Sequence, residues 1–199
     1  MKNLVLIGSG GHSGACADII QFLGKYKISF ILTTTKEHVN NKNILTYNQE
    51  NLKKIFKKNI KNTHIGIGQI TNLKLRSKIF EELRLLKFIF PHFISKSAYA
   101  SKFSKIGEGS IIMNGAIINS NTEIGKNVII NSGAIIEHNT TIGDNTHIGP
   151  GAIINGTAKI GKNCFIGSGS LIKQGLEIPD FTFVQAGRTI LNINELKKK

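Results

Sequence analysis

Hydrophobic residues recur along the second half of the chain with a strict period of six. From Ile106 to Ile178 every sixth residue is isoleucine, over 13 consecutive positions. A small or modest side chain stands four residues after each isoleucine, and glycine often follows it directly. Helices and flat strands have periods of 3.6 and 2 residues. A period of six predicts a parallel β-helix instead.

Each hexapeptide of such a β-helix supplies one short strand and one turn, and three hexapeptides close one triangular coil. The isoleucine and the small residue point inward, because branched aliphatic side chains fill a pleated, buried column well. Glycine and asparagine tolerate the backbone angles of the corners. About five coils fit from residue 94 onward. An ordinary β-rich segment with many isoleucines does not explain the unbroken register.

The first 90 residues alternate between strands and helices. Apolar runs predict strands at 2–7, 29–32, 63–68 and 87–90. Helices are predicted from Ala15 to Leu23, at 51–58 and at 73–86. The second is expected to be exposed, and the third to be basic and amphipathic. We therefore expect an α/β, Rossmann-like domain over residues 1–90 and a left-handed parallel β-helix over residues 91–199.

A glycine-rich turn from Gly8 to Gly14 joins the first strand to the first helix. Backbone N–H groups and the helix dipole make such a turn an anion site, suited to the phosphate of a nucleotide or nucleotide-sugar. Ser13 breaks the dinucleotide fingerprint, and Thr33–Thr35 after the second strand offers no acid to hold a ribose. NAD is therefore not expected. A turn that only packs a helix against a strand is the alternative.

Charge and cysteine content narrow the possible partners. The net charge is +14, but the lysines are scattered and no aromatic platform accompanies them, so nucleic acid is not expected. A basic surface favours polyphosphate ligands such as CoA or a nucleotide-sugar. Cys16 and Cys164 are the only cysteines, and the chain shows neither a signal-peptide pattern nor an apolar run of 18 residues. These features predict a cytoplasmic protein without disulfides or membrane insertion.

His138 and His147 are the only histidines of the repeat region, and both lie off the inward column. An imidazole titrates near pH 6.5, so an outward histidine can accept a proton at neutral pH. His12 and His64 are expected at strand ends that face the ligand region. A zinc site of the γ-carbonic-anhydrase type needs three histidines on the coils, so no metal is expected. The remaining histidines are interpreted as structural or solvated: His38 and His92.

The chain resembles the bacterial sugar O- and N-acetyltransferases of the sialic-acid O-acetyltransferase family over nearly its whole length. Beside the repeats, the resemblance rests on Gly8-Ser9-Gly10-Gly11-His12-Ser13-Gly14, Ile65-Gly66, Ser97-Ala98 and Ile136-Glu137-His138. It implies an acetyl-CoA-dependent N-acetyltransferase acting on a nucleotide-linked amino sugar, of the UDP-4-amino-4,6-dideoxy type, in bacterial surface glycan biosynthesis. An O-acetyltransferase of sialic acid or a related sugar is the alternative, and a nucleotide-sensing module without catalysis is another.

The resemblance also implies roles for individual residues. His138 would be the catalytic base and Glu137 would orient its ring. CoA would lie along the coils, with contacts at His147, Gly143, Gly167, Ala186 and Gly187. The sugar nucleotide would contact Gly8, Ser9, Gly10, Gly11, His12 and Gly66. Related enzymes are trimers, so we expect a homotrimer with each site between neighbouring β-helices.

The sequence departs from the family pattern at two places that bear on substrate binding. Many relatives carry an Asp-Asp pair after the second strand, where this chain has Thr33 and Thr34. Relatives often end in a Gly-x-Pro-Ala-Lys type segment, whereas here a short polar tail follows Thr189. The first departure bears on the nucleotide and sugar, and the second on the CoA end of the site.

Overall fold

The computed structural model describes residues 1–33, 43–69, 72 and 74–197. The chain forms two units, Met1–Gly68 with Lys78–Pro91, and Gln69–Ser77 with His92–Lys199. The main change of unit therefore lies one residue beyond the predicted boundary, while Gln69–Ser77 joins the second unit. Four residues named above lie outside the described residues: Thr34, Thr35, His38 and Leu73.

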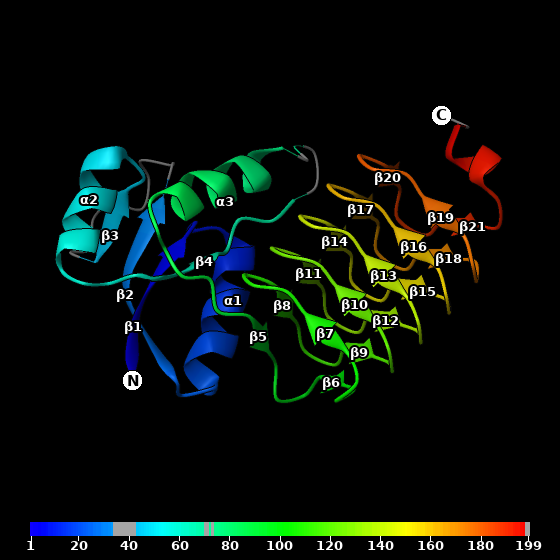
Figure 1. Cartoon of the computed structure of the whole chain (residues 1–199), viewed down its shortest axis with the longest axis horizontal. Helices are drawn as coiled ribbons and strands as arrows, with labels where there is room; N and C mark the ends of the chain where they lie inside the picture. Colours follow the sequence, from blue (N-terminus) through cyan, green and yellow to red (C-terminus); the bar gives the residue numbers. More distant parts are fainter. Residues whose placement is uncertain (34–42, 70–71, 73, 198–199) are drawn as a thin grey trace. The chain divides into compact units, whose positions relative to one another are not determined.

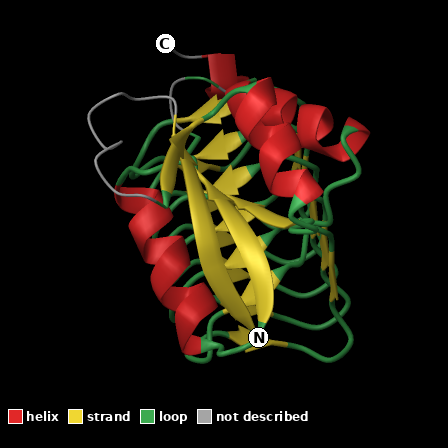
Figure 2. Ribbon diagram, turned by 90° about the vertical axis from the view of Figure 1, so that its left-hand side faces the viewer, coloured by secondary structure: helices red, strands yellow, loops and turns green. Residues whose placement is uncertain are grey.

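The first unit is built on a four-stranded sheet whose strands all run parallel, in the order β3-β2-β1-β4. β1 (Lys2–Ile7) lies inside the sheet, and its last four residues are at most 1% exposed because helices cover both faces (Figure 2). The other strands are β2 (Tyr26–Thr33), β3 (Ile44–Thr46) and β4 (Asn62–Ile65).

Three helices accompany this sheet, and the last of them begins in the second unit. They are α1 (Gly11–Phe22), α2 (Gln49–Lys57) and α3 (Leu75–Leu85). Val5 and Ile7 pack in one cluster with residues of α2 and α3, whereas Leu4 and Leu6 alternate to the opposite face. The predicted parallel α/β domain is confirmed.

Several local predictions for this unit differ from the structure. α2 was expected to be exposed, but Leu52 and Ile55 are each 1% exposed, because their spacing gives the helix an apolar face among its lysines. β3 was not predicted. The strand expected at 87–90 is reduced to a single bridge between Asn62 and Ile89. α1 begins at Gly11, so half of the predicted turn is helix.

The second unit is a parallel β-helix whose two-residue strands stack into three sheets, seen as the repeated rungs of Figure 1. The first sheet contains β5 (Phe93–Ile94), β8 (Ile111–Ile112), β11 (Ile129–Ile130), β14 (His147–Ile148), β17 (Phe165–Ile166) and β20 (Phe183–Val184). The second contains β6 (Tyr99–Ala100), β9 (Ile117–Ile118), β12 (Ile135–Ile136), β15 (Ile153–Ile154), β18 (Leu171–Ile172) and β21 (Thr189–Ile190). The third contains β7 (Lys105–Ile106), β10 (Glu123–Ile124), β13 (Thr141–Ile142), β16 (Lys159–Ile160) and β19 (Glu177–Ile178).

The second residue of each strand points into the coil, as the period of six predicted. Ile124 pairs with Ile142 and Ile142 with Ile160, so each residue stacks on the one 18 positions later. The isoleucines from Ile112 to Ile178 form one core cluster together with the small residues Ala116, Val128, Ala134, Ala152, Ala158 and Cys164. The predicted β-helix and its register are confirmed.

Buried hydroxyl groups tie each coil to the next. Ser110, Thr146 and Ser170 are at most 1% exposed, and each donates a hydrogen bond to a carbonyl 15 residues later, at 2.7, 2.7 and 2.8 Å. The Cys164 thiol fills the same kind of place and contacts the Pro179 carbonyl at 3.1 Å. Burial raises the pKa of this thiol to about 11, so it is a packed group rather than a nucleophile.

The outward residues give the second and third sheets different surfaces. The second sheet carries an apolar stripe, which we define as Tyr99, Ile117, Ile135, Ile153 and Leu171. The third sheet carries a charge ladder with ion pairs of 2.7 Å between Lys105 and Glu123 and between Lys159 and Glu177. No helix among the described residues is long and apolar enough to cross a membrane.

A short 3-10 helix, η2 (Ile193–Lys197), follows β21 at the end of the coils (Figure 1). Leu196 packs against the core cluster of the β-helix. The Glu195 carboxylate accepts hydrogen bonds from the backbone N–H of Leu191 at 3.0 Å and the side-chain amide of Asn192 at 2.7 Å. These contacts fix the turn that leads from β21 into η2.

Candidate functional site

The predicted substrate residues of the first unit gather at one edge of its sheet. The strand order reverses at β1, with β2 on one side and β4 on the other. Ligands of open α/β sheets bind outside the carboxyl ends of the strands at such a switch point. The turn after β1 and Gly66 after β4 both stand there, so the structure brings together Gly8, Ser9, Gly10, Gly11, His12 and Gly66.

Gly8 and Gly66 are needed to build this turn. Gly8 has a φ of +110°, which side-chain-bearing residues rarely adopt. A Cβ at Gly66 would stand 2.9 Å from the Ser13 Cα. Ser13 is buried and its hydroxyl donates to the Gly8 carbonyl at 2.7 Å. Its side chain thus closes the turn at the position where a dinucleotide fingerprint has glycine.

Gly10 and Gly11 have no such internal reason to be glycine. No described residue lies within 4 Å of where their Cβ atoms would stand, and both glycines are exposed. Gly10 caps α1 without a side-chain hydrogen bond, and the first turn of the helix contains no acidic residue. The backbone N–H groups at this helix end can therefore serve an anion. Beside them, the Ser9 hydroxyl contacts the Thr33 hydroxyl at 2.7 Å.

The two histidines of this unit differ in their surroundings. His12 lies in the first turn of α1, half-buried, with Nε2 3.5 Å from the Cys16 sulfur. His64 is 0% exposed inside β4, where Thr63 and Ile65 are buried as well. The prediction that His64 faces the ligand region is therefore wrong.

His138 stands at the corner that follows β12. The ring is exposed, and its Nδ1 lies 3.0 Å from the Asn139 side-chain amide. A Cβ at Gly156, one coil further on, would stand 2.8 Å from the ring. Glycine at that position makes room for the imidazole. Asn139 has a φ of 57°, and its amide oxygen accepts a hydrogen bond from Asn121 at 3.2 Å.

Glu137 does not contact this ring in the structure. Its carboxylate accepts a hydrogen bond from the Asn119 amide at 2.9 Å, one coil earlier. Glu137 was expected to orient the ring, but the side chain that contacts the ring is that of Asn139. Successive side chains on a corner point in different directions. Glu137 can therefore face away from the His138 ring while Asn139 faces it.

His147 is the outward residue of β14, but it is only 5% exposed. Its Nδ1 lies 2.8 Å from the Gln69 carbonyl, and its Nε2 lies 3.1 Å from the Asn131 amide. A carbonyl can only accept, so Nδ1 carries the proton and Nε2 accepts from Asn131. Burial lowers the pKa of His147 to about 4, and the nearby charge of Arg76 acts in the same direction. The ring is therefore neutral at pH 7.

This protonation state limits what His147 can do in a single chain. The ring offers no N–H at Nε2 with which to polarise a thioester carbonyl. Its role in binding CoA stays a prediction. His138 stands at the corner after β12 and His147 lies in β14, with β13 between them along the coil.

Gln69 and Arg76 were missed by the sequence analysis. The Gln69 amide donates to the carbonyls of Asn145 and Cys164, at 2.8 and 3.3 Å, while its own carbonyl holds His147. Arg76 is 1% exposed and donates through Nε to the Asn127 carbonyl at 3.2 Å. In the sequence they look like a loop residue and one charge of a basic helix. The one sequence signal for this corner is an asparagine repeated every 18 residues, at Asn127, Asn145 and Asn163.

The glycines predicted to contact CoA have structural reasons of their own. A Cβ at Gly143 would stand 2.6 Å from Gly161, and one at Gly167 would stand 2.3 Å from Ala186. The stacking of coils thus requires both glycines. Ala186 and Gly187 are exposed, with open space beside Gly187. The CoA contacts at these residues stay predictions. No group of three potential metal ligands occurs among the described residues.

Comparison with protein families finds both units. A family model described as PglD N-terminal domain matches residues 3–83, and one described as bacterial transferase hexapeptide (six repeats) matches residues 103–138 and 139–174. Together they cover most of the chain. It is a PglD-type hexapeptide-repeat acetyltransferase. A search of curated proteins finds no significant match to this acetyltransferase.

Three solved structures are similar to this chain over both units. PerB from Caulobacter crescentus, in complex with CoA and GDP-perosamine, is 26% identical with a TM-score of 0.88, over 96% of this acetyltransferase and 90% of PerB. The acetyltransferase domain of PglB from Neisseria gonorrhoeae, in complex with acetyl coenzyme A, is 26% identical with a TM-score of 0.84, over 96% and 91%. WeeI from Acinetobacter baumannii shares the fold, at 22% identity and a TM-score of 0.73, over 95% and 96%.

Proposed function

We propose that this acetyltransferase transfers the acetyl group of acetyl-CoA to the amino group of a nucleotide-linked amino sugar, of the UDP-4-amino-4,6-dideoxy type. The observation that supports a nucleotide-linked amino sugar is the likeness to PerB over 96% of the chain, since PerB holds both CoA and GDP-perosamine. The choice of UDP rests on the family resemblance of the sequence. The likeness to the PglB domain, which holds acetyl coenzyme A, supports the same donor.

The chemistry is a direct transfer with His138 as the general base. The amine attacks the thioester carbonyl carbon, so that a C–N bond forms and the C–S bond breaks. His138 takes a proton from the amine nitrogen and returns it to the sulfur of CoA. No acyl-enzyme is needed, which agrees with the buried Cys164 thiol. A general base of this kind contributes roughly 10²- to 10⁴-fold to the rate.

Asn139 is a positioning residue in this proposal. To accept a proton at Nε2, the neutral ring must carry its own proton at Nδ1, and that N–H needs an acceptor. Rotation of the Asn139 amide by half a turn places its oxygen opposite Nδ1. Asn121 can follow, because its amide also offers both a donor and an acceptor. The asparagine pair therefore supports the protonated ring after it has taken the proton.

The glycine turn supplies the binding site for the sugar nucleotide. The uncapped end of α1 and the open space at Gly10 and Gly11 suit a phosphate of the nucleotide. The hydroxyls of Ser9 and Thr33 add hydrogen-bonding groups without negative charge. Neutral groups here avoid repulsion of a diphosphate.

We further infer a homotrimer in which the apolar stripe of the second sheet packs against a neighbouring copy. Tyr99 is 59% exposed and Ile117 36% exposed, which leaves large apolar groups open to water on this face. Light scattering should give three times the chain mass of 21.8 kDa. A monomer at micromolar concentration with intact activity would contradict this assembly.

The substrate is tested by thiol release from acetyl-CoA with a panel of UDP-, GDP- and CMP-linked sugars. We expect turnover with a 4-amino sugar nucleotide and none with its deaminated 4-hydroxy analogue. The product should resist hydroxylamine, because an amide survives this reagent and an ester does not. An ester product from a sialic acid would replace this proposal with O-acetylation.

A further inference from the structure

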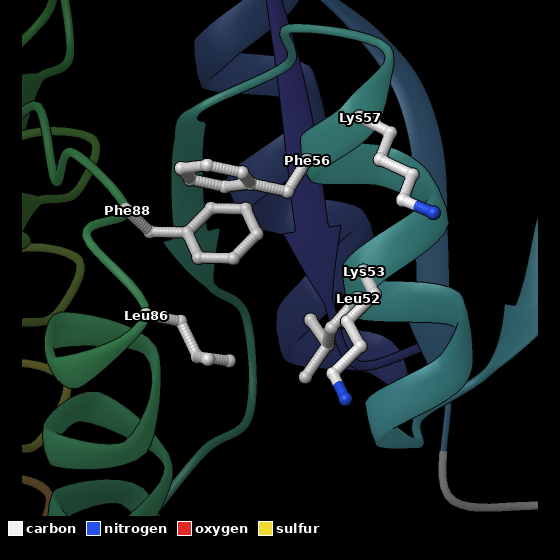
Figure 3. A pocket seen from close by; sticks show the side chains of 6 residues that line it. All are labelled: Leu52, Lys53, Phe56, Lys57, Leu86 and Phe88. Carbon is white, nitrogen blue, oxygen red and sulfur yellow. The ribbon is translucent and has the colours of Figure 1, made fainter.

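A hollow on the first unit takes no part in the proposed transfer. It has a volume of about 300 Å³ and lies between α2 and the residues that follow α3 (Figure 3). This volume is at the lower end of small-molecule sites. Its lining consists of Leu52, Lys53, Phe56, Lys57, Leu86 and Phe88.

The walls of the hollow are apolar. Leu52 and Leu86 face one another across it, and the rings of Phe56 and Phe88 meet at its side, with centroids 5.6 Å apart (Figure 3). Phe88 is 6% exposed, whereas Phe56 and Leu86 are half-buried. Among the described residues, no hydrogen-bonding side chain other than the two lysines lines it. The body of an occupant must therefore be apolar.

The backbone on both sides of the hollow is fixed by helix ends. After α3, Lys87 has a φ of 63° and donates to the Arg84 carbonyl at 3.0 Å, and Phe88 donates to the Leu83 carbonyl at 3.1 Å. After α2, Asn59 has a φ of 58° and its N–H donates to the Phe56 carbonyl at 2.9 Å. Such endings lock the chain direction, so the walls are preformed.

The mouth of the hollow is positively charged. Five lysines occur between residues 53 and 61, and Glu50 is the acid nearest to them in sequence on α2. Lys54 forms an ion pair with Glu50 at 2.7 Å, whereas no carboxylate of the described residues pairs with Lys53 or Lys57. Lys61 lies 5.4 Å from the centre of the Phe56 ring but is not part of the lining, so Lys53 and Lys57 are the two charges of the hollow.

We propose that this hollow binds a small anionic amphiphile, namely an aromatic or branched aliphatic carboxylate. Its apolar body would fill the space between Leu52, Leu86, Phe56 and Phe88, and its carboxylate would meet Lys53 and Lys57. A bare phosphate or a polynucleotide fits less well, because the apolar walls give it no hydrogen bonds. The volume holds roughly ten waters, which suits a body of about ten heavy atoms.

The test compares the affinities of naphthalene-2-carboxylate and of neutral 2-naphthalenemethanol. Each compound competes with bound 8-anilinonaphthalene-1-sulfonate, and the loss of the dye's fluorescence is measured. The carboxylate should bind once per chain, about three- to tenfold more tightly than the alcohol, as expected for partly exposed charge pairs. The double variant Lys53→Gln/Lys57→Gln should bind both compounds equally. Lys54→Gln, on the same helix but paired with Glu50, is the matched control and should change nothing.

A second variant tests the apolar half of the proposal. Leu86→Trp places a larger side chain in the hollow and should abolish binding of both naphthalene compounds, while circular dichroism confirms that the fold is kept. Equal binding of acid and alcohol to the wild type overturns the proposal, as does binding that Leu86→Trp leaves unchanged. Binding of an acidic amphipathic peptide but of neither compound would point to a protein partner and overturn it too.

Discussion

The second and third sheets of the β-helix share one interior and have opposite exteriors. Ile154 on β15 and Ile160 on β16 belong to the same core cluster, and each stacks on an isoleucine 18 residues away. One residue earlier, Ile153 contributes to the apolar stripe, whereas Lys159 pairs with Glu177 in the charge ladder. The inward position of each hexapeptide specifies the coil, and the outward position is free to specify how the coil is used.

The corner between these two surfaces is where His138 stands. It follows β12 of the apolar sheet and precedes β13 of the charged one. A neighbouring copy that covers the stripe would reach this corner, whereas the ladder would stay in water. In the proposed trimer, the exposed His138 would thereby gain the enclosure that proton transfer needs.

The largest effect is expected from breaking the shared interior. Ile154→Asp buries a carboxylate at a position that is 0% exposed and should cost more than about 4 kcal/mol of unfolding free energy, measured by urea denaturation. Ile153→Asp, the adjacent residue, should keep the circular dichroism spectrum of the folded coil and instead dissociate the trimer in light scattering. Equal loss of folding in both variants would refute the division into inside and outside.

The next effect tests the corner. His138→Ala should lower kcat by roughly 10²- to 10⁴-fold, with little change in KM for acetyl-CoA. Asn139→Gly removes the contact to Nδ1 without backbone strain, because glycine accepts a φ of 57°. It should lower kcat less and shift the pH profile. Near wild-type turnover in His138→Ala would remove the site assignment.

A smaller effect is expected from pH on the stability of the first sheet. This sheet carries neither the apolar stripe nor the charge ladder, and its outward residue His147 is buried. The pKa of His147 is about 4 in the folded protein and 6.5 when exposed, so the unfolded chain binds its proton first as pH falls. The stabilisation is complete above pH 6.5 and is lost as pH falls toward 4. Between pH 7 and 5 it amounts to about 2 kcal/mol.

Urea denaturation of His147→Gln checks this pH dependence. The variant keeps groups that can bond to Gln69 and Asn131 but does not titrate. The difference in unfolding free energy between the variant and the wild type should therefore change by about 2 kcal/mol from pH 7 to pH 5. A constant difference over this range would show that His147 titrates alike in both states.

The smallest effect is expected on the charge ladder. Lys159 and Glu177 are 64% and 69% exposed in their side chains, so water screens their ion pair. Lys159→Ala should change the melting temperature by less than about 2 °C and leave the oligomeric state alone. A large drop would mean that the ladder, rather than the interior, holds these coils together.

The sequence predicted the β-helix in detail because its signal repeats. Every inward isoleucine reports on the same column, so one irregular hexapeptide would hardly disturb the register. The glycine turn was also readable, since Gly8 and Gly66 occupy positions that a side chain would block. β3 and the buried face of α2 were harder to predict, because a three-residue strand and a lysine-rich helix carry little periodic signal.

The contacts around the histidines could not be read from the sequence. Burial of His147 depends on Gln69, which lies 78 residues earlier, and no local pattern connects the two. The partner of His138 proved to be Asn139 and not Glu137, which depends on the direction of side chains at one corner.

The turn held by Glu195 has a consequence for association of the protein. Each sheet of a stacked coil ends in a strand with unpaired backbone groups, and such an edge can template the addition of further strands. Solenoids need polar terminal caps for the same reason. η2 lies over this end with Leu196 on the core, and the carboxylate of Glu195 keeps the turn folded. A single acidic side chain thus helps to protect the end of the solenoid from fibre-like growth.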